Sequence, residues 1–136
     1  MYLRRWSERR NAQKLYNRIL LDNLTPINHR YAVDLCSGDG VMAEILVNLG
    51  WNPRDIVCID KFSSPTPLVT DARWLYVDLT QWADAITGNE PVPPIFMSMK
   101  STFHIVISAM TMEVPLQKIE TVSNFLLAPG GYSYHY

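Results

Sequence analysis

Four short apolar runs constrain the fold of this chain more than any other feature of its sequence. They occupy Tyr31–Cys36, Asp55–Ile59, Arg73–Val77 and Phe103–Ser108. Strands that read as almost continuous apolar residues are buried on both faces, as in parallel sheets covered by helices. The pattern therefore predicts a doubly wound, mainly parallel α/β sheet of the Rossmann-like kind, with Tyr132–Tyr136 as a fifth strand.

Helical segments separate most of these runs. The spacing of apolar residues predicts helices at 2–23, 41–49, 81–86 and 115–127. Three prolines make residues 88–94 an irregular connection, and Pro129 with two glycines is expected to separate the last helix from the last strand. At 136 residues the chain fits one domain. We expect a basic N-terminal helix and linker at 1–30 and the core at 31–136.

Charge is divided unevenly along the chain. Residues 1–30 hold seven Lys/Arg and two acids, a balance of +5, which leaves five basic and eleven acidic residues, a balance of −6, for the rest. The basic first helix is either a solvated face or a surface for an acidic partner or RNA. Leu15, Ile19 and Leu20 give this helix an apolar side, so we expect it to pack on the sheet.

The remaining composition excludes several classes of protein. Cys36 and Cys58 form no CxxC pair, and no signal peptide precedes the domain, which favours an intracellular location and gives no zinc site. No apolar stretch approaches the roughly 20 residues that a membrane span requires. We therefore expect neither a metal site nor a membrane-spanning segment.

A glycine-rich loop follows the first expected strand. Residues 34–40 read DLCSGDG, in which Gly38 and Gly40 let the backbone turn tightly and approach a ligand. Residues 38–43 also fit the G-x-G-x-x-G/A pattern of dinucleotide-binding loops. However, the carboxylate of Asp34 would repel a pyrophosphate, whereas it can pair with an ammonium group. The loop therefore favours a ligand with an amino-acid end.

Residues 32–40 resemble the first motif of class I S-adenosylmethionine-dependent methyltransferases, usually D-x-G-x-G-x-G, with Cys36 replacing the first glycine. Residues 56–60, 75–79, 103–110 and 125–131 resemble the later motifs of the same family in the same order. The resemblance covers about residues 31–136 and implies a strand order of 3-2-1-4-5. It also implies S-adenosylmethionine as the cofactor.

The resemblance assigns roles to individual residues. Asp60 would bind the ribose hydroxyls and Asp78 the adenine amino group, while Leu79 would pack on the adenine ring. The strand that ends at Ser108 would run under the methyl group. The full expected set of cofactor-binding residues is Asp34, Cys36, Ser37, Gly38, Gly40, Asp60, Lys61, Asp78, Leu79 and Ser108.

Each of these assignments has a structural alternative. Asp34 and Asp78 could instead cap helices or brace loops, and Asp60 could be a surface acid at a strand end. Glu113 lies where a reacting substrate would sit and is the candidate general base, with a solvated loop acid as its alternative.

Departures from the family leave three hypotheses for function. His104 stands where an Asp is usual, no N/D-P-P-Y motif follows the fourth strand, and the family normally adds two further strands and a helix. The chain is then a methyltransferase for an unidentified small-molecule or macromolecular acceptor. Alternatively, it is a non-catalytic methyltransferase-like domain that serves binding or assembly. The third hypothesis, a nucleotide-dependent oxidoreductase, is disfavoured by Asp34.

The last expected strand is an edge of the sheet. Its unpaired backbone groups and alternating tyrosines, Tyr132, Tyr134 and Tyr136, predict that something covers it. We expect either self-association about a two-fold axis or a partner protein. The alternative is that the connection 88–100 folds over this edge.

Overall fold

The structure, a computed structural model, describes residues 2–109 and 114–136, with side chains from residue 8 onward. Within these ranges the strands form one sheet in which all pairs are parallel. The strands are β1 (Ala32–Leu35), β2 (Ile56–Asp60), β3 (Arg73–Tyr76), β4 (Phe103–Ser108) and β5 (Leu127–His135). Their order is β3-β2-β1-β4-β5, which confirms the predicted Rossmann-like fold.

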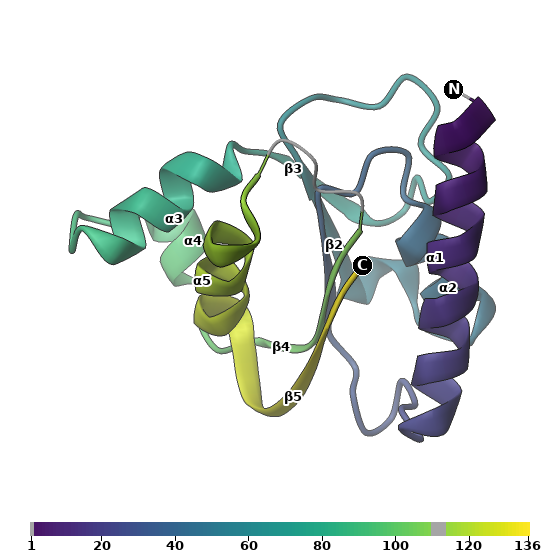
Figure 1. Ribbon diagram of the computed structural model, residues 1–136. Coiled ribbons are helices and arrows are strands. Elements are labelled where there is room, and N and C mark those ends of the chain that lie inside the picture. The colour runs from purple at the N-terminus through teal and green to yellow at the C-terminus, as the bar shows by residue number, and fades with distance from the viewer. Residues whose placement is uncertain (1, 110–113) are drawn as a thin grey trace.

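Helices cover both faces of the sheet (Figure 1). Helices α1 (Tyr2–Leu21) and α2 (Val41–Asn48) lie on one face, and α3 (Leu79–Thr87), α4 (Pro94–Met97) and α5 (Leu116–Leu126) lie on the other. A short 3-10 turn, η1 (Pro53–Asp55), leads into β2. The result is a three-layer α/β/α arrangement.

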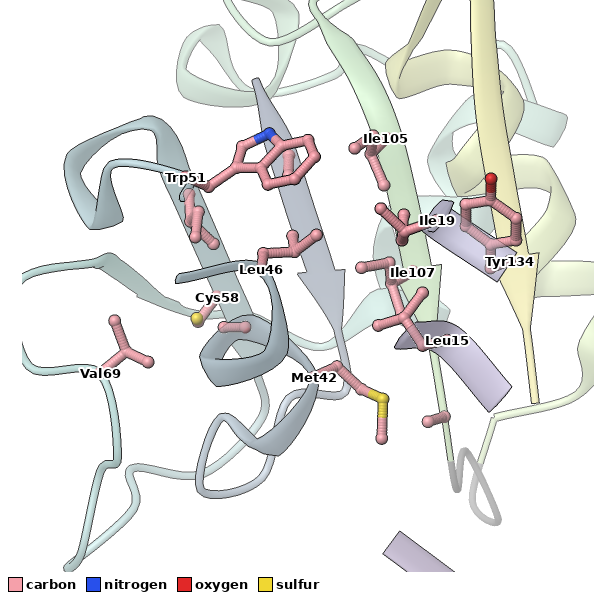
Figure 2. Close-up of a cluster of buried hydrophobic side chains, with 14 of the residues drawn as sticks. Leu15, Ile19, Met42, Leu46, Trp51, Cys58, Val69, Ile105, Ile107 and Tyr134 are labelled. Atoms are coloured by element: carbon pink, nitrogen blue, oxygen red, sulfur yellow. The ribbon is translucent and has the colours of Figure 1, made fainter. Parts of the chain in front are cut away.

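The first hydrophobic core lies between the sheet and helices α1 and α2. Leu15 and Ile19 of α1 point at Ile107 of β4 and Tyr134 of β5 (Figure 2). The N-terminal helix therefore packs on the sheet, as expected. Leu20 does not take part, because it is 51% exposed. The buried stripe instead follows Ala12, Leu15 and Ile19, which share one helical face.

The second core lies between the sheet and helices α3 and α5. Val33, Leu35 and Val106 face it from the sheet, while Trp82 and Ile119 face it from the helices. Alternate strand residues therefore enter opposite cores. This double burial is the physical reason why the strands read as continuous apolar runs.

Two element boundaries differ from the sequence-based expectation on the α3–α4 side. Helix α3 begins at Leu79, two residues early, because the Asp78 carboxylate accepts a hydrogen bond from the Thr80 N–H at 2.9 Å and caps its first turn. The connection expected to be irregular has no helix or strand over residues 88–93, and α4 begins at its last residue, Pro94, which stands at the first helical position, where its missing N–H costs nothing. Phe96 of this segment stacks on Trp82, so the connection lies against α3.

Strand β5 begins at Leu127, five residues earlier than expected. The Pro129–Gly131 segment forms an irregularity inside the strand, because Phe103 pairs with Leu127 whereas Ile105 pairs with Tyr132. A proline is tolerated at a sheet edge or bulge, where no ladder hydrogen bond needs its nitrogen. Gly131 allows the close approach, since a Cβ there would lie 3.0 Å from the His104 carbonyl oxygen.

The chain itself covers part of the aromatic side of β5, since Tyr134 is 7% exposed whereas Tyr132 is 38% exposed. The Tyr134 hydroxyl donates a hydrogen bond to Asp22 Oδ2 at 2.6 Å, and the Tyr132 ring packs edge-on against His29 at 5.3 Å. The outer backbone edge of β5 pairs with no strand within residues 2–109 and 114–136. A protein partner or second copy at this edge therefore stays a prediction, and it concerns the backbone and the exposed Tyr132 ring rather than Tyr134.

Candidate functional site

The candidate site lies at the carboxyl ends of β1, β2 and β4. The chain order reverses between β1 and β4, so the loops that follow these two strands diverge there. Ligands of open parallel sheets bind at such a switch point. The loop 36–40 follows β1, Asp60 ends β2 and Ser108 ends β4.

The loop after β1 has an unusual backbone. Cys36, Gly38 and Gly40 all have positive φ angles, of 55°, 54° and 90°. Cys36 replaces the first glycine of the family motif, yet it keeps the left-handed conformation that favours glycine. Gly40 also allows a close packing contact, because a Cβ there would lie 3.3 Å from the Trp74 ring.

Hydrogen bonds hold this loop against β2. The Ser37 N–H donates to the Ile59 carbonyl at 3.0 Å, and the Gly40 N–H donates to the Ser37 carbonyl at 2.8 Å. The loop 61–72 continues the support, because the Ser64 hydroxyl donates to Asp39 Oδ1. The loop is therefore fixed before any ligand binds.

Asp34 is buried at the end of β1, with 2% of its surface exposed. Its Oδ2 atom has no hydrogen-bond partner within the described chain. Burial raises the pKa of its carboxyl to about 8; the Ala43 N–H in the first turn of α2 opposes this shift, and the charge of Asp60 adds to it. The Asp34 side chain thus takes the helix-capping role that was one of its two expected roles, and its Oδ2 atom remains without a partner within the described residues.

An unsatisfied buried carboxylate oxygen is costly, because burial without a partner removes its hydration. A cationic N–H donor that entered the site would compensate that cost and would favour the ionised carboxylate. The environment of Asp34 therefore fits an ammonium group.

Asp60 lies half-buried beside Asp34 and braces the glycine loop. Its Oδ2 accepts a hydrogen bond from the Gly38 N–H at 2.8 Å, and its Oδ1 accepts one from the Phe62 N–H at 3.3 Å. Each carboxylate oxygen has more than one lone pair, so both can still accept from a hydroxyl group. Asp60 is thus a bracing residue with remaining acceptor capacity.

The residues expected at the adenine end have structural partners. Asp78 caps α3 and lies 3.9 Å from the Lys61 ammonium nitrogen. Leu79 is 3% exposed and packs in the second core. The structural alternative weighed for Asp78 is therefore realised, and an adenine contact there stays a prediction.

Ser108 is 1% exposed at the end of β4. Its Oγ lies 2.5 Å from Nδ1 of His135, its neighbour on β5. No sequence motif includes His135, and only its place at the carboxyl end of a strand could have drawn attention to it. Glu113, the expected general base, lies outside the described residues.

Other candidate features have simple structures. Cys58 is buried, and burial raises the pKa of its thiol, so it behaves as an apolar core residue. No group of three metal-ligating side chains lies close enough to hold an ion within the described ranges. No helix of that part of the chain is long and apolar enough to cross a membrane.

The outward face of α1 carries the predicted basic surface. Arg9, Arg10 and Lys14 line a shallow hollow of about 440 Å³ together with Gln13 and Asn17. All five residues belong to one helix, so the hollow lies between long side chains rather than inside the fold. Binding of an acidic partner or RNA at this face stays a prediction.

No known protein-family model matches the sequence, and no curated protein is detectably similar to it. The case for function therefore depends on the geometry of the carboxyl edge.

Proposed function

We propose that this domain binds S-adenosylmethionine at the carboxyl edge of its sheet and transfers the methyl group to an acceptor. The observation that carries the proposal is the buried Asp34 carboxyl at the switch point, whose Oδ2 has no hydrogen-bond partner among residues 2–109 and 114–136. The amino-acid end of S-adenosylmethionine supplies the ammonium group that this oxygen lacks. The residues present thus fit the group.

The same observation argues against a dinucleotide. A pyrophosphate carries negative charge, and Asp34 lies close enough to Asp60 for one carboxylate to raise the pKa of the other. A pyrophosphate at this edge would be repelled by the charge of Asp60, and it would bring no cationic donor to Asp34, whose carboxyl keeps its proton at neutral pH without one. A nicotinamide-dependent oxidoreductase is therefore disfavoured.

The reaction asks for positioning more than for covalent help from the protein. Bound S-adenosylmethionine supplies a sulfonium methyl group that is already activated for transfer. Asp34 would hold the amino-acid end, the fixed loop 36–40 would shape the backbone around it, and Asp60 would accept from the ribose hydroxyls. Holding two reactants in line supplies a large part of the rate in such reactions.

A non-catalytic binding domain is the second candidate, and one observation favours it. The carboxylates of Asp60 and Asp78 both accept hydrogen bonds from the protein's own backbone N–H groups. These contacts stabilise the fold without a ligand, as expected if the fold were kept for binding or assembly.

Calorimetry with S-adenosylmethionine, S-adenosylhomocysteine and NAD tests the proposal. We expect the two adenosyl ligands to bind and NAD not to bind. Asp34→Asn should weaken this binding strongly while Asp71→Asn, a change at an exposed acid, should leave it intact. Binding of NAD alone would overturn the proposal, and ligand binding without methyl transfer to any acceptor class would favour the second candidate.

A further inference from the structure

A serine and a histidine form a close pair at the carboxyl edge. Ser108 and His135 are register partners at the ends of the neighbouring strands β4 and β5. The Ser108 Oγ and His135 Nδ1 atoms lie 2.5 Å apart, and the Tyr136 N–H donates to the Ser108 carbonyl at 2.8 Å. Both the side chains and the backbone therefore fix the position of the imidazole.

The pair stands beside the switch point. Ser108 is also the register partner of Leu35, the last residue of β1, one position after Asp34. Ser108 is fully buried, whereas His135 is only partly buried. The imidazole is therefore the member of the pair that a molecule at this edge can reach.

Burial, rather than a neighbouring charge, favours the neutral form of the His135 ring. Burial lowers the pKa of the imidazole, and the negative charge of Glu120, on α5, opposes this effect. Ser108 faces the ring from β4 and carries no charge. A neutral imidazole at physiological pH has one nitrogen with a free lone pair, so it can accept a proton.

The hydrogen bond at one ring nitrogen sets the role of the other. When Nδ1 carries the proton and donates it to Ser108 Oγ, the lone pair of Nε2 is free. This tautomer turns the ring into a base directed away from Ser108.

We propose that His135 is the base that takes the proton of the methyl acceptor, with Ser108 as its positioning residue. The inference rests on the proposed function. The acceptor is then a neutral hydroxyl or amine, X–H, since an acceptor without such a proton has no use for a base. Its X–C bond forms as the methyl–sulfur bond breaks, the electron pair stays on sulfur to give a thioether, and the proton moves to His135 Nε2.

The tautomer is the first test, and it needs no ligand. Nitrogen-15 NMR of the full chain between pH 5 and 9 reports the protonated nitrogen of each histidine. We expect the Nδ1–H form at His135. Ser108→Ala should remove this preference, whereas Ser133→Ala, at an exposed position of the same strand, should preserve it. An Nε2–H form in the unchanged protein would overturn the inference.

The second test uses diethyl pyrocarbonate, which acylates unprotonated imidazole nitrogens. The other two histidines, His29 and His104, are internal controls, because they lie together at the opposite, amino edge of the sheet, with ring centroids 6.1 Å apart. Saturating S-adenosylhomocysteine should abolish modification of His135 and leave these two unchanged, as measured by mass spectrometry.

The outcomes separate the two proposals, because calorimetry on the same samples shows whether S-adenosylhomocysteine is bound. Bound ligand with unprotected His135 overturns the role of His135 alone. Absence of binding overturns the proposed function, and the role of His135 falls with it.

Discussion

The buried carboxyl of Asp34 should make ligand binding depend on pH. Its pKa of about 8 means that the ligand-free protein holds a proton on this side chain at neutral pH. An ammonium ligand pairs with the carboxylate, so binding must release that proton. Affinity therefore rises with pH and levels off above the pKa.

The size of the effect follows from the fraction of carboxylate. With a pKa of about 8, this fraction rises from about 1% at pH 6 to about 50% at pH 8. The affinity for S-adenosylhomocysteine should then rise about 50-fold, equivalent to about 2.3 kcal/mol. At pH 7 binding should release about 0.9 proton per ligand.

Titration calorimetry in two buffers of different ionisation enthalpy measures both quantities. Asp60 and Cys58 are the titratable groups that act on Asp34, and the burial of Cys58 keeps its thiol protonated over this range. Asp34→Asn should bind weakly and without pH dependence, because its amide does not ionise. An affinity that stays constant from pH 6 to 8, with no proton released by the unchanged protein, would refute the reasoning.

Three further predictions concern stability and binding. The pKa of Asp34 is raised in the folded protein above its unfolded value of 3.8, so between about pH 4 and 8 the folded state binds a proton that the unfolded state does not. The free energy of unfolding should therefore fall by about 1.4 kcal/mol per pH unit over this range. Urea unfolding at several pH values should show this dependence, and Asp34→Asn should lack it. Asp60→Ala should weaken S-adenosylhomocysteine binding by about 1.5–3 kcal/mol and leave the Gly38 N–H without its acceptor, and unchanged affinity in calorimetry would remove Asp60 from the site. Leu15→Ala should cost about 2–5 kcal/mol of unfolding free energy in the same urea assay, whereas the matched change Leu21→Ala, at a 69% exposed position, should cost less than about 0.5 kcal/mol.

The sequence predicts the sheet well because burial on both faces leaves a strong local signal. Strands β1, β3 and β4 lie within their apolar runs, β2 extends one residue past its run to Asp60, and the strand order follows from the resemblance. The predicted start of β5 is wrong, because Pro129, Gly130 and Gly131 are residues typical of a turn. Pairing with β4 overrides that signal by absorbing these residues into an irregular register.

The location of the candidate site could be predicted from the sequence, whereas the hydrogen bonds of its residues could not. Strand ends at a switch point are known from topology, so the region of Asp34 and Asp60 could be named from sequence. Whether an oxygen of Asp34 finds a partner among the described residues depends on tertiary packing, which no motif encodes. His135 was missed because its partner Ser108 lies 27 residues earlier in the chain, and only the register of β4 and β5 brings them together.

The hydrogen bond between Tyr134 and Asp22 has a consequence for the order in which the protein folds. It joins residues 112 positions apart, so α1 packs against a strand that is synthesised well after it. The side chains of Leu15 and Ile19 therefore cannot be buried against β5 until that strand has been synthesised. Closing so long a loop is slow compared with forming the local βα units. Docking of the first helix should accordingly be a late event, and substitutions in α1 should act mainly on the unfolding rate.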